Sequence, residues 1–183
     1  ILNELPQIVK QGVTSIKFFL AYKNSLMIDD GTLYKALLKA KECGALVMVH
    51  CENGEIIDVL TKKLLADGKT QPVYHAISRP AELEEEATTR AIMIANLANA
   101  PIYIVHLSAR KALEKVIEAR KKGQKVYAET CPHYLIFDIN KLKEKNFGGG
   151  KFVMSPPLRE KDDIKSLWDG LKNNNLQTVA SDH

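Results

Sequence analysis

Four side chains that can bind or activate a metal ion stand within or directly after apolar segments of the sequence. His50 ends "ALVMVH", His106 ends "IYIVH", Asp182 follows "QTVAS", and Lys17 lies inside "SIKFFLAY". If each segment is a parallel strand, the carboxyl ends of the strands face the same way and these residues converge at one edge of a sheet. Two imidazoles and a carboxylate are a common ligand set for a catalytic divalent ion. The spacing therefore predicts a metal site built from separate strands.

Each of these residues also has a purely structural interpretation. A single histidine at a strand end is more often a hydrogen-bonded structural group than a ligand, and Asp182 alone could cap the segment that follows it. Lys17 could extend its amine to water along its aliphatic stem, or pair with an acidic neighbour. The recurrence of such residues at successive strands favours the metal site.

Lys17 fits a metal site only when it is not an ammonium group, because an ammonium has three donors and no acceptor. A neutral amine can bind a metal, and the pKa of a lysine falls readily on burial. A lysine can also react with carbon dioxide to give a carbamate, whose two oxygens and negative charge could bridge two cations. Coordination would then offset the cost of burying the group.

Short β-rich segments alternate with longer helical patterns, which is typical of βα units around a parallel sheet. We expect one α/β domain over residues 1–183, because no linker divides the chain and no repeat recurs. The predicted strands are residues 15–20, 45–50, 102–106, 125–129 and 178–181.

Four helices are predicted between these strands from capping residues and closing glycines. A run of glutamates from Glu84 to Glu86 lies in the third helix and is expected to form a solvated face rather than a metal site. The caps and closing residues are Asp29 or Asp30 with Gly44, the "ENG" segment with Gly68, Ser78 and Pro80 at the start of the third helix, and Ser108 with Gly123.

Residues 130–157 interrupt the βα pattern with several prolines and a glycine triplet. This segment is expected to be a long excursion from the sheet. In parallel α/β proteins such loops usually build the active site.

The composition suits a folded domain, with 45% hydrophobic residues, 26% charged residues and a net charge of +4. No basic block or basic-aromatic pattern points to nucleic acid. The three cysteines are odd in number and lack a CxxC spacing, which favours reduced thiols in a cytoplasmic protein. No apolar run approaches the ~20 residues of a membrane helix, and no secretory leader is visible.

Six segments in order resemble the cyclic amidohydrolases of the hydantoinase and dihydropyrimidinase family, most closely the bacterial hydantoinases. They are "IKFFLAYKN", "GALVMVHCENGEIIDVLTKK", "IYIVHLSA", "YAETCPHYL", "VMSPPLREK" and "VASDH". The resemblance implies a distorted (β/α)8 barrel of the TIM type with a two-metal centre, usually zinc, at the carboxyl ends of its strands. It also implies a cytoplasmic, usually tetrameric, enzyme of pyrimidine catabolism.

The resemblance further implies a role for each matching residue. Lys17 matches the carboxylated lysine (N6-carboxylysine) that bridges both metals, and His50 and His106 match the histidines of the more exposed metal. Asp182 matches the aspartate that binds the buried metal and acts as the catalytic base. Tyr22 matches a tyrosine that polarises the substrate carbonyl. One further residue, Ser155, matches a position that holds the substrate ring through main-chain contacts.

By this resemblance a hydroxide bridging the two metals attacks the amide carbon of a five- or six-membered cyclic ureide. One metal and Tyr22 stabilise the oxyanion, and Asp182 moves the proton to the leaving nitrogen. The product is an N-carbamoyl amino acid.

The sequence departs from the family pattern by lacking the His-x-His pair of the first barrel strand, and it begins at Ile1 and stops after "VASDH". We therefore expect a partial catalytic barrel that holds roughly the fourth to eighth strands, lacks the first strands and the C-terminal part of a longer parent, and is inactive alone. His75, His133 and His183 cannot replace the missing pair; His133 is expected to be a structural group or to lie behind the ligands, and His183 cannot be placed.

Three residues beside His50 are assigned from their position alone. Cys51 is adjacent to His50, so a thiolate ligand is conceivable. Neighbouring strand residues point to opposite faces, however, which favours packing for this cysteine. Glu52 and Asn53 are expected to shape the loop or to hydrogen-bond near the site.

Two alternatives to a hydantoinase remain. Hydantoinase-like scaffold proteins of neuronal signalling share the fold but lack the metal ligands, so the presence of all four candidate ligands here favours an enzyme. Allantoinase and dihydroorotase share the site plan, and ring preference depends on loops.

Overall fold

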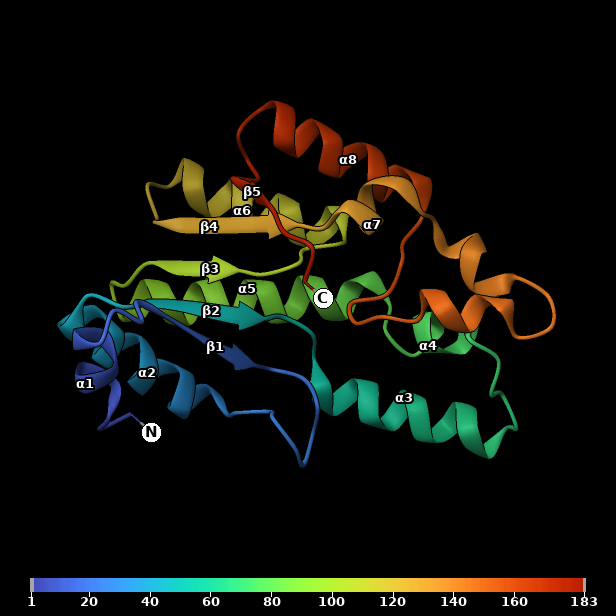
Figure 1. The fold of residues 1–183 in the computed structure, drawn as a ribbon, viewed down its shortest axis with the longest axis horizontal. Helices are drawn as coiled ribbons and strands as arrows, with labels where there is room; N and C mark the ends of the chain where they lie inside the picture. The colour runs from blue at the N-terminus through green and yellow to red at the C-terminus, as the bar shows by residue number, and fades with distance from the viewer. Residues whose placement is uncertain (1, 183) are drawn as a thin grey trace.

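The computed structural model describes residues 2–182 and contains, within them, a five-stranded parallel sheet in the order β1-β2-β3-β4-β5 (Figure 1). All five predicted strands are confirmed, although β3 and β5 are shorter than expected. Their bounds are β1 Ser15–Phe19, β2 Leu46–His50, β3 Ile102–Ile104, β4 Val126–Thr130 and β5 Thr178–Val179. His106, which was expected to be the last residue of its strand, consequently lies two residues beyond β3, and Asp182 follows β5 as expected.

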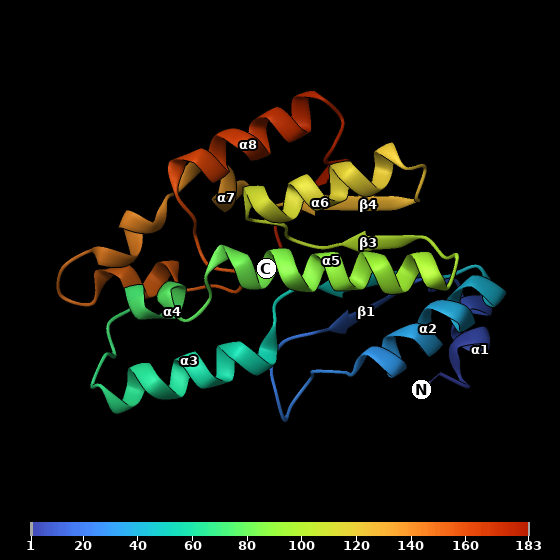
Figure 2. The same cartoon turned by 180° about the vertical axis from the view of Figure 1, so that it is seen from behind.

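Helices α2, α5 and α6 cover one face of the sheet, as the views from the two sides show (Figures 1 and 2). Helix α3, α4 and the two short 3-10 helices lie beyond the carboxyl ends of the strands (Figure 1). The helices are α1 Leu5–Lys10, α2 Asp30–Cys43, α3 Gly54–Ala66, α4 Val73–Ile77, α5 Ala81–Leu97, α6 Arg110–Lys121, α7 Pro132–Ile136 and α8 Lys161–Lys172, with η1 Ile139–Lys143 and η2 Gly148–Phe152. No helix in the described range is long and apolar enough to cross a bilayer.

Local capping explains the ends of α2. The Asp29 carboxylate accepts a 2.6 Å hydrogen bond from the backbone N–H of Thr32, and Gly44 ends the helix with φ of +77°. A left-handed residue at this position costs little only when it is glycine. The predicted limits of α2 are confirmed.

The "ENG" segment caps α3 through Asn53 and Pro80 directly precedes α5, both as predicted, but Ser78 and Ser108 are not the N-terminal caps that the sequence pattern predicts. Ser78 is buried at the end of α4, a short helix that the sequence pattern did not predict, and α5 begins after Pro80. Ser108 does not cap α6 either, because its hydroxyl donates to Glu84 of α5 at 2.6 Å. Contacts with distant parts of the chain therefore determine how α5 and α6 begin.

Glu84 corrects the expectation of a solvated glutamate face. Its side chain is 2% exposed and accepts hydrogen bonds from the backbone N–H groups of Ser108 and Ala109, at 2.7 and 3.1 Å. The carboxylate of one helix therefore caps the N-terminus of the next, where a negative charge is favourable. Arg159 completes the arrangement with a 2.8 Å ion pair to Glu84.

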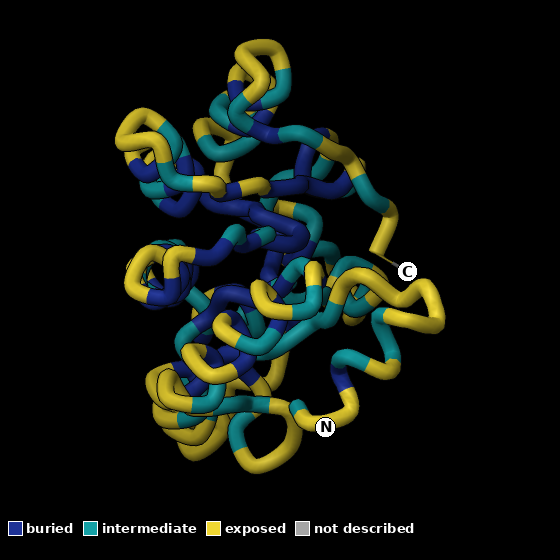
Figure 3. The backbone as a smooth tube through the Cα atoms, turned by 90° about the vertical axis from the view of Figure 1, so that its left-hand side faces the viewer, coloured by how far each residue is buried: buried dark blue, intermediate teal, exposed yellow. Residues whose placement is uncertain are grey.

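The two faces of the sheet differ in burial. Val47, Ile102 and Val126 lie in register on the face covered by helices and are fully buried. Figure 3 shows the burial of the backbone, with buried segments in the interior and exposed ones at the periphery. On the opposite face Lys17 is in register with Met48, and both are only partly buried. Parallel sheets are normally covered on both faces. Within residues 2–182 this second face has no covering layer of helices.

Residues 130–157 leave the sheet after β4, as expected, and contain α7, η1 and η2 before the chain reaches α8. The segment returns toward the carboxyl ends of the strands (Figure 1). This return brings Ser155 back toward the end of the sheet at which Tyr22 lies.

Candidate metal centre

His50 and His106 meet at the carboxyl end of the sheet. Nδ1 of His50 lies 3.0 Å from Nε2 of His106, the ring centroids are 4.6 Å apart, and the two residues are 1% and 2% exposed. His50 is the last residue of β2, whereas His106 lies two residues beyond β3. The strands thus bring two imidazole nitrogens together in a dry environment.

Glu52 determines which nitrogen of His50 faces His106. Its Oε2 lies 2.8 Å from Nε2 of His50, and a carboxylate can only accept, so Nε2 carries the proton. Nδ1 is then left with a lone pair directed at His106, which is the arrangement found behind metal-bound histidines. The expectation that Glu52 hydrogen-bonds near the site is confirmed.

Asn53 shapes the loop after β2, also as expected. Its side-chain oxygen accepts from the backbone N–H of Ile56 at 3.1 Å and so caps α3. Its amide nitrogen donates to Glu86 at 2.7 Å. These bonds attach the loop that carries Glu52 to both α3 and α5.

Lys17 and Asp182 form a second pair in which Nζ lies 3.6 Å from Oδ1. Their side chains are 32% and 41% exposed, so Lys17 is not a fully buried ammonium group. The Lys17 Nζ also lies 5.3 Å from the ring centroid of Phe19. The partial exposure and the acidic partner together explain how a lysine is tolerated inside β1.

The charge of Lys17 affects the pKa of His106. Burial, and then the neighbouring His50 and the Lys17 charge, hold the pKa of His106 well below its ordinary value. His106 is therefore a neutral imidazole at physiological pH, and only a neutral imidazole can bind a metal.

His50 and His106 are close enough to bind the same divalent ion. Two nitrogens bound to one tetrahedral zinc ion lie about 3.3 Å apart, close to the 3.0 Å between His50 and His106. Over residues 2–182 no group of three or more His, Cys, Asp or Glu side chains is arranged as a metal site. His183 lies outside the described residues.

Tyr22 stands beside the histidines, with its ring centroid 5.1 Å from that of His50. Burial raises the pKa of its phenol, and an interaction with the Ser155 hydroxyl opposes that rise. The phenol therefore stays protonated near neutral pH and can donate a hydrogen bond. The structure brings together Tyr22 and Ser155, which are far apart in the sequence.

Three of the candidate residues have left-handed backbone conformations, with φ of +64° at Tyr22, +40° at His106 and +49° at Asp182. Such angles are uncommon for residues other than glycine, although asparagine, aspartate and histidine adopt them more often than the rest, and they cluster at functional sites when the surrounding structure enforces them. Asparagine occupies most of the other non-glycine positions with positive φ in the described chain. This strain is a signal that the sequence does not display.

Cys51 packs in the core, as predicted. It is buried, its thiol contacts the carbonyl of Val49 at 3.6 Å, and burial raises the pKa of the thiol far above its ordinary value. A protonated thiol that faces away from His50 is not a metal ligand. The ring of His133 packs on Tyr134. Burial lowers the pKa of His133, and the Asp182 charge opposes this shift only in part.

Comparison with known proteins places this arrangement in a family, although no family model matches the chain. The chain is 55% identical to the D-hydantoinase of Geobacillus stearothermophilus over 183 residues, covering all of the chain and 39% of that protein. The chain belongs to the hydantoinase and dihydropyrimidinase family.

Other members of the hydantoinase family are also similar to the chain in sequence and structure. The D-hydantoinase of Ralstonia pickettii is 48% identical, with 100% of the chain and 40% of that protein covered. The crystal structure of the dihydropyrimidinase from Brevibacillus agri matches with a TM-score of 0.98 and 56% identity, covering 100% of the chain and 40% of that structure. The chain thus spans about 40% of the length of these relatives. Its five parallel strands correspond to part of the hydantoinase TIM barrel.

Proposed function

We propose that this sequence supplies part of the active site of a cyclic amidase that converts hydantoins or dihydropyrimidines into N-carbamoyl amino acids. The observation that carries the proposal is the convergence of His50 and His106, 3.0 Å apart, beside Tyr22. The 55% identity to a D-hydantoinase supports the choice of substrate class.

His50 and His106 would hold one divalent ion, zinc being the expected metal, through the nitrogens that face each other. A carboxylated Lys17 would be shared with a second ion held by Asp182. Bound divalent ions supply a water of lowered pKa and polarise the scissile carbonyl.

The protein groups around the ring have separate tasks. The protonated Tyr22 phenol donates a hydrogen bond to the oxygen that becomes negative during attack. Asp182 carries the proton to the leaving nitrogen. The main chain at Ser155 holds the ring. Tyr22, Ser155 and Asp182 lie in loops that follow different strands, so the fold must bring these loops together.

Lys17 has two roles in this proposal. In the metal-free chain it is an ammonium group paired with Asp182 at 3.6 Å. With metal bound, Lys17 would serve as a carbamate ligand and Asp182 as a carboxylate ligand. The chain has no His-x-His pair, so the 183 residues alone are expected to be inactive. We further propose that the complete enzyme is cytoplasmic and tetrameric.

The test is a chimera in which these 183 residues replace the matching segment of the Geobacillus stearothermophilus enzyme. We expect zinc-dependent hydrolysis of hydantoin and dihydrouracil, and an intact mass that shows one added carbon dioxide at Lys17. The isolated chain should be inactive. A folded, metal-loaded chimera without activity on either ring would overturn the proposal and favour a scaffold protein. Hydrolysis of allantoin or dihydroorotate instead would correct the substrate class.

A further inference from the structure

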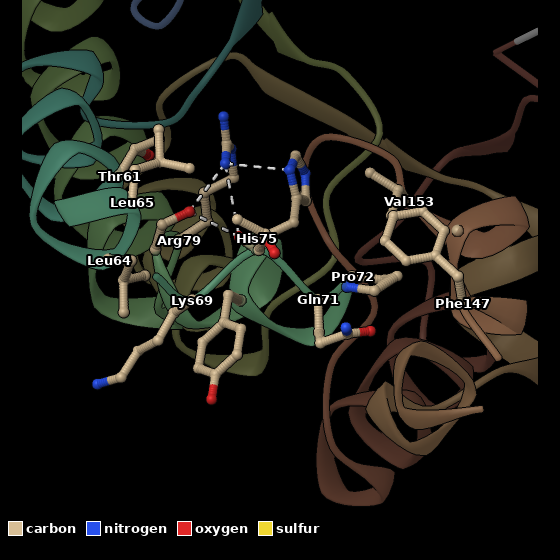
Figure 4. A pocket seen from close by; sticks show the side chains of 14 residues that line it. Thr61, Leu64, Leu65, Lys69, Gln71, Pro72, His75, Arg79, Phe147 and Val153 are labelled. Atoms are coloured by element: carbon tan, nitrogen blue, oxygen red, sulfur yellow. Dashed lines mark hydrogen bonds between the residues drawn. The ribbon is translucent and has the colours of Figure 1, made fainter. Parts of the chain in front are cut away.

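His75 lies at the side of the candidate site, between Arg79 and the segment of Met154 and Ser155. Its Nε2 is 2.8 Å from the carbonyl oxygen of Met154 and 3.1 Å from the hydroxyl of Ser155. Its Nδ1 is 3.2 Å from Nη1 of Arg79, and Figure 4 shows this contact at one end of a cavity. His75 comes from α4, the short helix that the sequence pattern did not predict.

The two partners determine where the proton of His75 resides. A guanidinium group can only donate, so Nδ1 accepts from Arg79, and a carbonyl can only accept, so Nε2 donates to Met154. Burial and the Arg79 charge also lower the pKa of His75, which keeps the ring neutral. The imidazole is therefore a directed donor toward the segment of Met154 and Ser155.

Arg79 is itself held in place. Its Nη1 donates to the Ser78 hydroxyl at 2.9 Å, and its carbonyl oxygen accepts from Arg159. Arg159 is in turn paired with the buried Glu84 at 2.8 Å. His75 thus links a rigid ionic core to the loop that carries Ser155.

His75 stands at the edge of a cavity. A cavity of about 430 Å³ adjoins the ring, lined by residues of α3, α4 and η2 (Figure 4). Outside α4 the ring has polar contacts with Arg79, Met154 and Ser155.

We propose that His75 is a positioning residue for the substrate ring, because it fixes the Met154 carbonyl and the Ser155 hydroxyl beside Tyr22. The proposal rests on the function proposed above and extends it. His75 would act on ring binding and leave metal binding unchanged, since it contacts none of the candidate ligands.

The first test uses the 183-residue chain and NMR of the imidazole nitrogens. At neutral pH the His75 ring should be the Nε2–H tautomer. In Arg79→Met the Nε2–H tautomer should persist, because the Met154 carbonyl still accepts, and the pKa of His75 should rise, because the nearby positive charge is lost. A ring that is Nδ1–H or protonated in the unmodified chain would overturn the proposal.

The second test uses the chimera, with His75→Ala, His75→Gln and the control Gln71→Ala, a residue of the same cavity. Loss of one hydrogen bond predicts a KM about three- to tenfold higher in His75→Ala, with kcat and zinc content nearly unchanged. His75→Gln should restore most of the KM, because the glutamine amide can donate to Met154. The Gln71 variant should be normal.

The outcomes separate the two proposals. An inactive parent chimera overturns the proposed function, while the tautomer measurement still reports on His75. An active chimera whose KM does not change in His75→Ala overturns the positioning role. A lower zinc content or an equal fall in kcat in both His75 variants also overturns it, because that result indicates a general structural role.

Discussion

Nδ1 of His50 lies 3.0 Å from Nε2 of His106, although 56 residues separate them in the chain. Glu52 directs the lone pair of His50 into this contact from the other side of the ring. The pair is therefore oriented for a cation before any cation arrives.

We predict that the isolated chain binds Zn²⁺ and that His50→Asn or His106→Asn weakens binding more than about tenfold, because each removes a ligand. Glu52→Gln should weaken binding less, through the loss of orientation. Competition with a chromophoric zinc chelator measures the affinities. Cys51→Ala is the matched control, adjacent to His50 but facing the core, and should bind zinc normally. Equal affinity in the histidine variants would contradict the site.

The ion pair of Glu84 and Arg159 should be essential for stability. Glu84→Ala leaves a buried arginine and two backbone N–H groups of α6 without an acceptor, which is expected to cost about 3–5 kcal/mol in the free energy of unfolding. Urea unfolding measures this change.

Glu85→Ala is the control for that variant. Glu85 is partly exposed and pairs with Lys115 at 3.3 Å, so its loss should cost less than about 1 kcal/mol. If the two variants lost similar free energies of unfolding, the buried contacts of Glu84 would contribute no more to stability than the exposed pair of Glu85.

Gly54 should not tolerate a larger side chain. A Cβ there would lie 2.9 Å from Cα of Ala21 and 3.0 Å from the carbonyl oxygen of Leu20, directly before Tyr22. Gly54→Ala is therefore expected to displace the Tyr22 loop and to destabilise the chain by about 1–3 kcal/mol. Gly31→Ala, whose Cβ meets nothing closer than 3.5 Å, should be neutral or slightly stabilising in thermal unfolding. Equal melting temperatures for both variants would contradict this packing.

His75 should make stability depend on pH. Burial and Arg79 lower its pKa below the ordinary 6.5, so between the folded pKa and 6.5 the unfolded chain binds the extra proton. The free energy of unfolding should therefore fall as the pH is lowered through 6.5, and His75→Gln should fall less steeply. Urea unfolding at about pH 7.5 and pH 5.5 compares them. Parallel losses in the two proteins would exclude His75 as a source of the dependence.

Much of the fold follows from short-range patterns. The five strands, their parallel arrangement and the limits of α2 depend on apolar runs, capping side chains and a closing glycine, which act within a few residues. The family resemblance rests on linear motifs of the same kind. The same local patterns predict that His50, His106 and Asp182 lie at or just after strand ends and that Lys17 lies inside a strand.

Only the tertiary structure decided the partners of the polar side chains. Glu84 looks like a surface residue in sequence, yet the packing of α5 on α6 buries it against Ser108 and Arg159. His75 contacts Met154 and Ser155 across about 80 positions of the chain. The sequence by itself determined which chemical groups stand at the strand ends, because strand formation is local. The hydrogen-bond partners of these side chains and the tautomers of the histidines depend on distant segments that meet only when the chain has folded. They are therefore decided by the tertiary structure.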